Sequence, residues 1–374
     1  MAFIDRDISD RRGKSLTARL HLDMPLLAGL IVLVGFGLLI LYSASGESSD
    51  QLNRQIIRLT VAFMAMIFLA WIPPRIYKKW TPFIYAGGIL LLLAVVVVGE
   101  EGKGAQRWLN FGVFRFQPSE IMKLAVPMMV AWYFSERKLP PTLRELAVVA
   151  IIIAVPTYLI LIEPDLGTSI LIASSGAFAV FLAGIRWRIL LSFITVTIIY
   201  APIHWLFVMQ AYQKQRVLTF LDPEQDRLGS GYHIIQSQIA IGSGGLHGKG
   251  WLQGTQSQLE FLPERNTDFI FAVLGEEFGF FGVLLLISIY LWIVGRGFMI
   301  SIKAQETYTR LLAGAITLTF FVYVFVNIGM VTGILPVVGL PLPLVSYGGT
   351  SMVTLMASFG ILMGIQTHKK LLPG

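Results

Sequence analysis

Residues 268–295 read DFIFAVLGEEFGFFGVLLLISIYLWIVG, and their only charged side chains are Asp268, Glu276 and Glu277. The run is longer than the roughly 20 residues that a helix needs to cross a hydrocarbon layer. The whole chain has the same character: of its 374 residues, 55% are hydrophobic and 14% charged, and the mean hydropathy is +0.71. A soluble domain carries about a quarter charged residues. The composition therefore excludes a soluble enzyme, a disulfide scaffold and a disordered tail, and it indicates a polytopic membrane protein.

Nine further apolar runs have a length close to that of a membrane span. With 268–295 they predict an all-α fold of about ten transmembrane helices; the other nine are 24–43, 56–73, 81–99, 118–135, 145–162, 167–184, 187–208, 311–332 and 343–366. The fifth and sixth are separated only by Glu163-Pro164-Asp165, so they predict a tight helical hairpin. Because the boundaries between 163 and 187 are weakly marked, eight or nine spans are the alternative.

The charges predict the orientation of these helices. Ten spans place both termini on one side, where 18 of the 29 lysines and arginines fall, against seven of the 22 acids. Short basic loops mark the cytoplasmic side, so residues 1–23 and the tail 368–374 are predicted to be cytoplasmic, flanking one transmembrane domain over 24–367. The first span exceeds the apolar length of a cleaved signal and is read as a retained helix. The net charge of +7 then reflects topology rather than nucleic-acid binding.

The opposite, outer side has one long loop, between residues 209 and 267. Loops of this length are usually functional. Its middle, 233–241, has apolar residues at helical spacing, which predicts an amphipathic helix on or in the outer leaflet. The glycine-rich run 242–250 predicts turns. It would serve as a phosphate cradle only with support from elsewhere, because the sequence has no Gly-Lys-Ser/Thr of a nucleotide-binding loop.

Two candidate sites lie where predicted spans begin. Glu120 and Lys123 are three residues apart and share one helical face, so they are expected to pair. Glu120 also suits the first turn of a helix, whereas Lys123 lies deeper and needs a partner or an anionic ligand. Asp165 is the second acid of the shortest outer turn, and capping of the next helix toward Thr168 explains it locally.

Asp268 closes the long loop at the predicted membrane boundary. It either caps the following helix or presents a carboxylate to a polar substrate, and Glu276 and Glu277 follow two turns later. Three carboxylates near one end of a transmembrane helix favour a functional interpretation.

Outer cations are not required by topology, and together they would balance an anionic head group such as a pyrophosphate. The candidates are Arg107, Arg115, Lys214, Arg216, Lys249 and Arg265. The chain has no cysteine and no zinc-binding or dinucleotide pattern. No cofactor is therefore predicted, the participation of a divalent cation is left open, and an ion or proton transporter remains an alternative.

Four segments carry a resemblance to a known family. They are GAQRWL (104–109) with FQPSE (116–120); EPDLGTS (163–169); GYHIIQS (231–237) with FLPE (261–264) and TDFI (267–270); and Asn327 followed by PLPLVSYGGTS (341–351). In this order the chain resembles the SEDS family (shape, elongation, division and sporulation). Within that family it resembles the members that act in cell elongation and rod shape, and the likeness runs from the first span to the last.

The resemblance implies an inverting peptidoglycan glycosyltransferase that polymerises lipid II at the outer face of the bacterial inner membrane. It implies that Asp268 is the general base and that Glu120, Lys123 and Asp165 line the same cavity. Lys123, Arg216, Lys249 and Arg265 are the candidates to receive the departing pyrophosphate. The implied partners are a class B penicillin-binding protein and other membrane proteins of the elongation complex. The alternatives are a flippase for lipid-linked precursors, a division-type member with the same chemistry, and a non-catalytic scaffold.

Overall fold

The computed structural model describes residues 21–102, 105–110, 115–163, 165–226, 229–259, 261–262 and 264–368. Most of the predicted cytoplasmic segment 1–23 and of the tail 368–374 lies outside the described residues, as do Gly104, Pro164 and Pro263 of the family motifs.

Ten long helices among the described residues form the body of the protein, and each overlaps a predicted span. They are α3 (Met24–Ala44), α4 (Ser49–Trp71), α5 (Pro74–Val98), α6 (Pro118–Ser135), α7 (Leu143–Ile162), α8 (Leu166–Leu182), α9 (Trp187–Ile203), α13 (Ile270–Ile302), α14 (Thr307–Thr332) and α15 (Thr350–Thr367). Eight of them are long and apolar enough to cross a membrane, α9 being counted together with the π-helix η1 (His204–Val208); α8 is apolar but shorter. The prediction of an all-α polytopic membrane protein is confirmed.

The differences from the predicted bounds have local causes. Helix α4 begins at Ser49, well before its apolar run, because Ser48 caps a polar first turn. Helix α15 begins only at Thr350, and the preceding residues 333–349, which the sequence placed partly in the last span, are not helical. That non-helical segment contacts the site described below.

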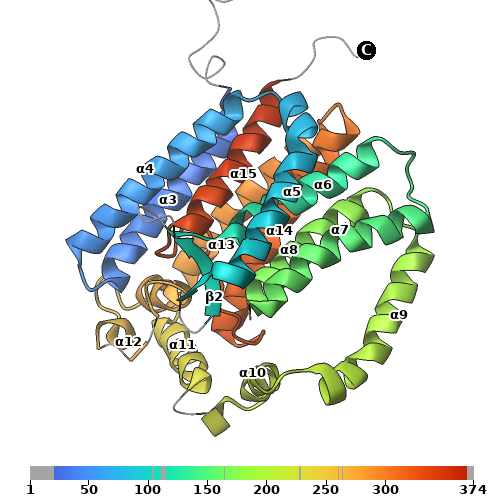
Figure 1. The fold of residues 1–374 in the computed structure, drawn as a ribbon. Helices are drawn as coiled ribbons and strands as arrows, with labels where there is room; N and C mark the ends of the chain where they lie inside the picture. The colour runs from blue at the N-terminus through green and yellow to red at the C-terminus, as the bar shows by residue number, and fades with distance from the viewer. Residues whose placement is uncertain are drawn as a thin grey trace, which may run out of the picture.

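The helices pack around α14. Two-thirds of its most apolar window is buried, against none of α9, and it contacts α13, α8, α6 and α15. Figure 1 shows α9 standing apart from the bundle and joined to it through α10 (Ala211–Leu221). The predicted hairpin of α7 and α8 forms, with the two helices packed side by side.

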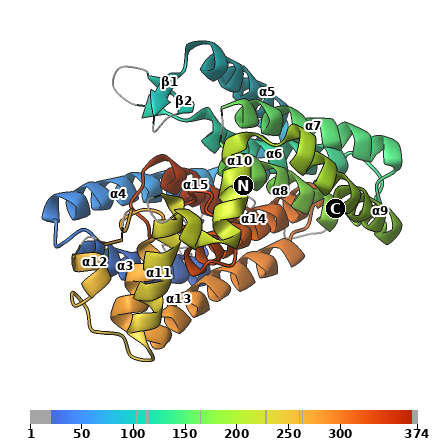
Figure 2. The same ribbon diagram turned by 90° about the horizontal axis from the view of Figure 1, so that it is seen from below.

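The two ends of the bundle differ. One end carries the loop helices α10, α11 (Ser230–Gly244) and α12 (Thr255–Gln258), and it is called the loop face here (Figure 1). The other end, called the termini face, carries His21 and His368, whose rings stack with centroids 4.0 Å apart. The second view shows α11 and α12 lying across the ends of α3 and α13 (Figure 2).

Helix α11 contains the predicted helix 233–241, so that prediction is confirmed. It packs on α13 and α14. Ser237 Oγ donates a hydrogen bond to the carbonyl of Val331 at 2.7 Å, and a Cβ on Gly244 would lie 2.0 Å from the carbonyl oxygen of Gly275. Glycine is thus required for this close approach. Placement in the outer leaflet stays a prediction.

A small antiparallel sheet between α5 and α6 was not predicted. Its strands are β1 (Glu100–Gly102), β2 (Ala105–Asn110) and β3 (Arg115–Phe116), in the order β1-β2-β3. Strands of two to six residues leave almost no alternating pattern to detect. The sheet matters because β2 carries Arg107 to the loop face.

Candidate functional site

Asp268 lies on the loop face, two residues before α13. Phe269 is the N-cap of that helix, and the helix has no side-chain capping bond, so helix capping does not account for Asp268. Asn327, fully buried on α14, donates from Nδ2 to the carbonyl oxygens of Asp268 at 2.9 Å and Leu340 at 2.6 Å. A buried amide that bonds two backbone carbonyls fixes the position of both.

A second clamp holds the residues before Asp268. Ser346 Oγ donates to the carbonyl of Thr267 at 2.5 Å and accepts from the backbone N–H of Leu342 at 2.7 Å. The N–H of Tyr347 donates to the carbonyl of Asn266 at 2.8 Å. Ser346 and Tyr347 therefore position the loop that ends in Asp268.

Glu120 and Lys123 form the predicted pair on α6. Lys123 Nζ lies 2.8 Å from Glu120 Oε1, and the two side chains are 10% and 7% exposed. Glu120 Oε2 and Ser119 Oγ are buried and have no hydrogen-bond partner among the described residues. Buried polar atoms are normally satisfied, so these two mark a place where a ligand or water would bind.

Asp165 has both a structural and an electrostatic role. Its Oδ1 accepts from the N–H of Thr168 at 3.1 Å, so the predicted cap of α8 is confirmed. Its Oδ2 lies 3.7 Å from Arg107 Nη1 and accepts from Gln117 Nε2 at 3.5 Å. Asp165 therefore joins the start of α8 to β2 and to the start of α6.

The neighbouring Glu163 was not singled out from the sequence. It is 4% exposed, and its Oε1 is buried without a partner among the described residues. Burial, and then the negative charge of Asp165, raise the pKa of Glu163 to about 8. At pH 7 this carboxyl group is therefore mostly protonated, a property that only its tertiary surroundings determine.

Residues 338–340 lie between Asp268 and the group formed by Glu120, Lys123 and Asp165. A Cβ on Gly167 of α8 would lie 2.9 Å from the carbonyl oxygen of Val338, and one on Gly339 would lie 3.5 Å from Asp268 Oδ2.

Tyr323 on α14 links the same groups. The centroid of its ring is 5.3 Å from Lys123 Nζ, and the side chain lies within electrostatic range of Glu120, Asp165 and Asp268. We call Asp268, Glu120, Lys123, Asp165 and Arg107 the carboxylate site.

Lys249 has a different environment. Its Nζ lies 2.7 Å from Glu276 Oε1, and the same carboxylate accepts from Thr255 Oγ1 at 3.1 Å and from the N–H groups of Gln256 at 2.9 Å and Ser257 at 3.3 Å. Glu276 thus attaches the 249–257 loop to α13. This structural role was not predicted from the sequence. The positive charge of Lys249 is already balanced.

The glycine run 242–250 packs against a kink in α13. Gly279 has φ 62° and ψ −158°, which interrupts the helix. The N–H groups of Lys249 and Gly250 donate to the carbonyls of Glu276 and Glu277, each at 3.0 Å. These N–H groups therefore bond the two carbonyls that the kink leaves without helical partners. The structure thus shows a packing role for the glycine run.

The two remaining cations that the resemblance assigned to the pyrophosphate, Arg265 and Arg216, lie elsewhere in the 209–267 loop. Arg265 donates from Nη1 to the carbonyl of Ser257 and lines a polar pocket beside Asn266. Arg216 is half-buried on α10.

An apolar groove of about 670 Å³ begins beside the start of α8. It lies between α7 and α8 on one side and η1 and α10 on the other, and its lining includes Tyr158, Leu166, Ser169, His204 and Met209. Leu166, which lines this groove, directly follows Asp165 in the chain.

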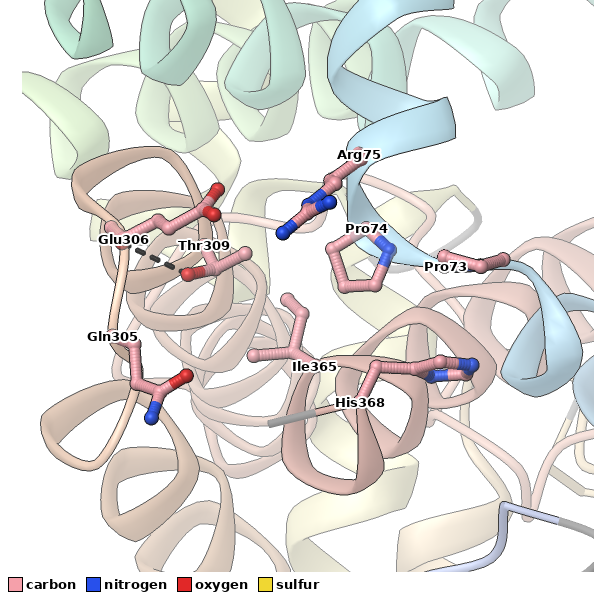
Figure 3. Close-up of a pocket in the computed structure, with 8 residues that line it drawn as sticks. All are labelled: Pro73, Pro74, Arg75, Gln305, Glu306, Thr309, Ile365 and His368. Atoms are coloured by element: carbon pink, nitrogen blue, oxygen red, sulfur yellow. Dashed lines mark hydrogen bonds between the residues drawn. The ribbon is translucent and has the colours of Figure 1, made fainter. Parts of the chain in front are cut away.

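A separate pocket of about 310 Å³ lies on the termini face (Figure 3). Its lining includes Arg75, Glu306 and His368, and Thr309 Oγ1 donates to the carbonyl of Glu306 at 2.8 Å. None of the predicted site residues lines this pocket. Among the described residues, no group of three His, Asp or Glu side chains is placed to hold a metal ion.

These features define a class of protein: a polytopic membrane protein with a buried group of charged side chains at one end of its bundle and an apolar groove beside it. The family model described as FtsW/RodA/SpoVE, cell cycle protein, matches residues 24–371. The chain belongs to this family, as its sequence motifs predicted.

Known proteins of the family are similar over nearly the whole chain. The peptidoglycan glycosyltransferase MrdB of Escherichia coli is 53% identical over 359 residues, covering 96% of this chain and 97% of that protein. A probable peptidoglycan glycosyltransferase FtsW of Geobacter metallireducens is 35% identical, covering 93% and 95%.

Solved structures have the same fold. One, described as the structural coordination of polymerization and crosslinking by a peptidoglycan synthase complex, matches with a TM-score of 0.81 at 29% identity, over 92% of this chain and 97% of that one. The rod shape determining protein RodA of Thermus thermophilus matches with a TM-score of 0.71 at 26% identity, over 93% and 98%.

Proposed function

We propose that this protein is a peptidoglycan glycosyltransferase that polymerises lipid II into β-1,4 glycan strands for cell elongation. The observation that carries the proposal is the clamped position of Asp268 across the 338–340 segment from a buried cluster with unpartnered polar atoms. The similarity to MrdB, which exceeds that to FtsW, supports the elongation role over the division role.

In the proposed reaction Asp268 is the general base. Its carboxylate takes the proton from the 4-hydroxyl of the acceptor's N-acetylglucosamine as that oxygen attacks C1 of the donor's N-acetylmuramic acid. The C1–O bond to the polyprenyl pyrophosphate breaks, the pyrophosphate leaves with the bonding electrons, and the configuration at C1 inverts from α to β. A base within hydrogen-bond reach of the attacking hydroxyl satisfies the geometric requirement for this step.

The leaving pyrophosphate needs positive charge nearby. Lys123 and Arg107 are the best placed cations, because each already lies within the carboxylate site. The salt bridges to Glu120 and Asp165 would be exchanged in part for phosphate oxygens when substrate binds. Arg216, Lys249 and Arg265 remain weaker candidates, since Lys249 is paired with Glu276 and Arg265 bonds the Ser257 carbonyl.

We also propose a path for the lipid tail, an orientation in the membrane and a partner protein. The apolar groove between α7, α8 and α10 provides a path for a polyprenyl chain whose head group lies at Asp165. We place the loop face outside the bacterial inner membrane and both termini in the cytoplasm, as the positive-inside rule requires. The matching synthase complex supports assembly with a class B penicillin-binding transpeptidase and, with it, other membrane proteins of the elongation complex.

The experiment that tests this function is polymerisation in detergent. The purified chain, with its penicillin-binding partner, is incubated with lipid II, and glycan strands are resolved by gel electrophoresis. An enzyme makes polymer without a bilayer, whereas a flippase has no membrane to act across. Absence of polymer, together with translocation of lipid II in reconstituted vesicles, would establish the flippase alternative.

A further inference from the structure

The polar pocket beside Asn266 has a volume of about 630 Å³ and opens on the loop face near Asp268. Helix α4 contributes Gln51 and Arg54, the segment before Asp268 contributes Glu264, Arg265 and Asn266, and Tyr347 completes the lining. It shares no lining residue with the crevice that contains Glu120 and Lys123. The two cavities are therefore distinct.

The pocket is tied rigidly to the carboxylate of Asp268. Asn266 Nδ2 donates to Gln51 Oε1 at 3.0 Å, and the carbonyl of Asn266 accepts from the N–H of Tyr347 at 2.8 Å. Thr267, the next residue, also lines the pocket and directly precedes Asp268. A ligand held here would thus be positioned by the same backbone segment as Asp268.

The chemistry of the lining fits a saccharide better than a pyrophosphate. Two carboxylates, Asp50 and Glu264, offset two guanidinium groups, Arg54 and Arg265, so the pocket has no excess of positive charge. Amide, carboxylate and guanidinium groups form directed hydrogen bonds to hydroxyl and acetamido groups. Asn266 Oδ1 is buried without a partner among the described residues, which leaves an acceptor for a ligand N–H or O–H.

The position of the pocket indicates which saccharide it takes. Asp50, Arg54 and Glu264 are exposed, so an occupant can extend out of the pocket into water. The apolar groove lies elsewhere, between α7, α8 and α10, and shares no residue with this pocket. The saccharide units of a growing strand beyond its lipid-linked end carry no lipid of their own and extend away from the membrane, and such units fit this pocket.

We infer that the pocket between α4 and the 262–267 segment binds the N-acetylhexosamine units of the growing strand and retains it between additions. This inference rests on the proposed function and assigns the units of the strand beyond the one that reacts at Asp268 to a particular place. Loss of a pocket contact would then release strands early without slowing the chemical step.

The test compares Arg54→Ala with Asn53→Ala. Arg54 lines the pocket, whereas Asn53 is the adjacent exposed residue of α4 and does not. Both proteins are purified with their partner and given lipid II in detergent. The rate of the first coupling and the length distribution of the strands are measured separately. For Arg54→Ala we expect the first coupling to stay within about twofold of the unmodified rate and strands at least about tenfold shorter, the effect of one lost hydrogen bond from a charged group.

A second variant tests whether shorter strands come from a folding defect of Arg54→Ala. Asp50→Asn keeps the shape of its side chain, and we expect it to make shorter strands than the unmodified protein, as Arg54→Ala does. Three results would overturn the inference: strands of unmodified length from both pocket variants, equal shortening by Asn53→Ala, or loss of the first coupling in Arg54→Ala. In each of these cases, polymer from the unmodified chain would still support the proposed function. An unmodified chain that makes no polymer would overturn both.

Discussion

Glu276 and the carboxylate site both lie near the loop face, and their surroundings differ. Glu276 on α13 accepts four hydrogen bonds from the 249–257 loop, including that from the ammonium of Lys249. In the carboxylate site, by contrast, Glu120 keeps one buried oxygen without a partner among the described residues, as does Glu163 beside it. A carboxylate whose bonds are all made by the protein stabilises the fold, whereas one with an open position can serve a ligand.

The comparison predicts a large effect of charge where Asp165 meets Arg107. Asparagine caps a helix as well as aspartate does, so Asp165→Asn is expected to preserve α8 and its stability while removing the negative charge beside Arg107. We expect polymerisation to fall about 10- to 100-fold, because a hydrogen bond to a charged group contributes about 1.5–3 kcal/mol and each 1.36 kcal/mol is tenfold in rate.

The measurement is the initial rate of polymerisation from lipid II, with the thermal unfolding midpoint recorded on the same preparation. An Asp165→Asn protein that keeps its full rate would remove Asp165 from the site and leave it with the capping role alone.

Glu163 gives a smaller effect that depends on pH. Because its pKa is raised to about 8, the carboxyl group is neutral at lower pH and ionises as the pH rises through that value. Ionisation places a second negative charge beside Asp165, so we expect the polymerisation rate to decline on the alkaline side with an apparent pKa near 8. Glu163→Gln stays neutral and is expected to match the unmodified rate well below this pH and to exceed it above.

The pH–rate profiles of the two proteins check this prediction. An alkaline limb that is identical in both would show that ionisation of Glu163 does not limit the reaction.

Glu276 is expected to affect activity least. Glu276→Gln removes the charge that Lys249 pairs with and weakens the attachment of the 249–257 loop, so the free energy of unfolding should fall by about 1–3 kcal/mol. The rate per folded molecule should stay within about twofold of the unmodified rate, because four internal hydrogen bonds leave Glu276 no part in substrate binding. A large loss of rate at unchanged stability would contradict the distinction between the two groups.

Much of this could be predicted from local sequence patterns. The ten helices follow from apolar runs, the Glu120–Lys123 pair from helical spacing, and the cap by Asp165 from the chemistry of a helix start. Each depends on residues within a few positions of one another, where geometry is fixed by the helix itself.

The rest depends on contacts between distant segments. Asn327 reaches Asp268 from 59 positions away, and Ser346 reaches Thr267 from 79. Lys249 was grouped with the anion-binding cations because its partner Glu276 lies on another element, 27 positions along the chain. The three short strands were missed because they are held by pairing with one another and carry no periodicity of their own.

The central claim is that Asp268 is the base, and Asp268→Asn tests it most directly. The unmodified protein, Asp268→Asn and the control Asp222→Asn, which alters an exposed carboxylate elsewhere on the loop face, are purified with the partner transpeptidase and given lipid II in detergent. We predict that Asp268→Asn lowers the polymerisation rate by about 100-fold or more, the usual contribution of a general base, and that Asp222→Asn leaves it unchanged. Polymerisation by Asp268→Asn at the unmodified rate would contradict the account.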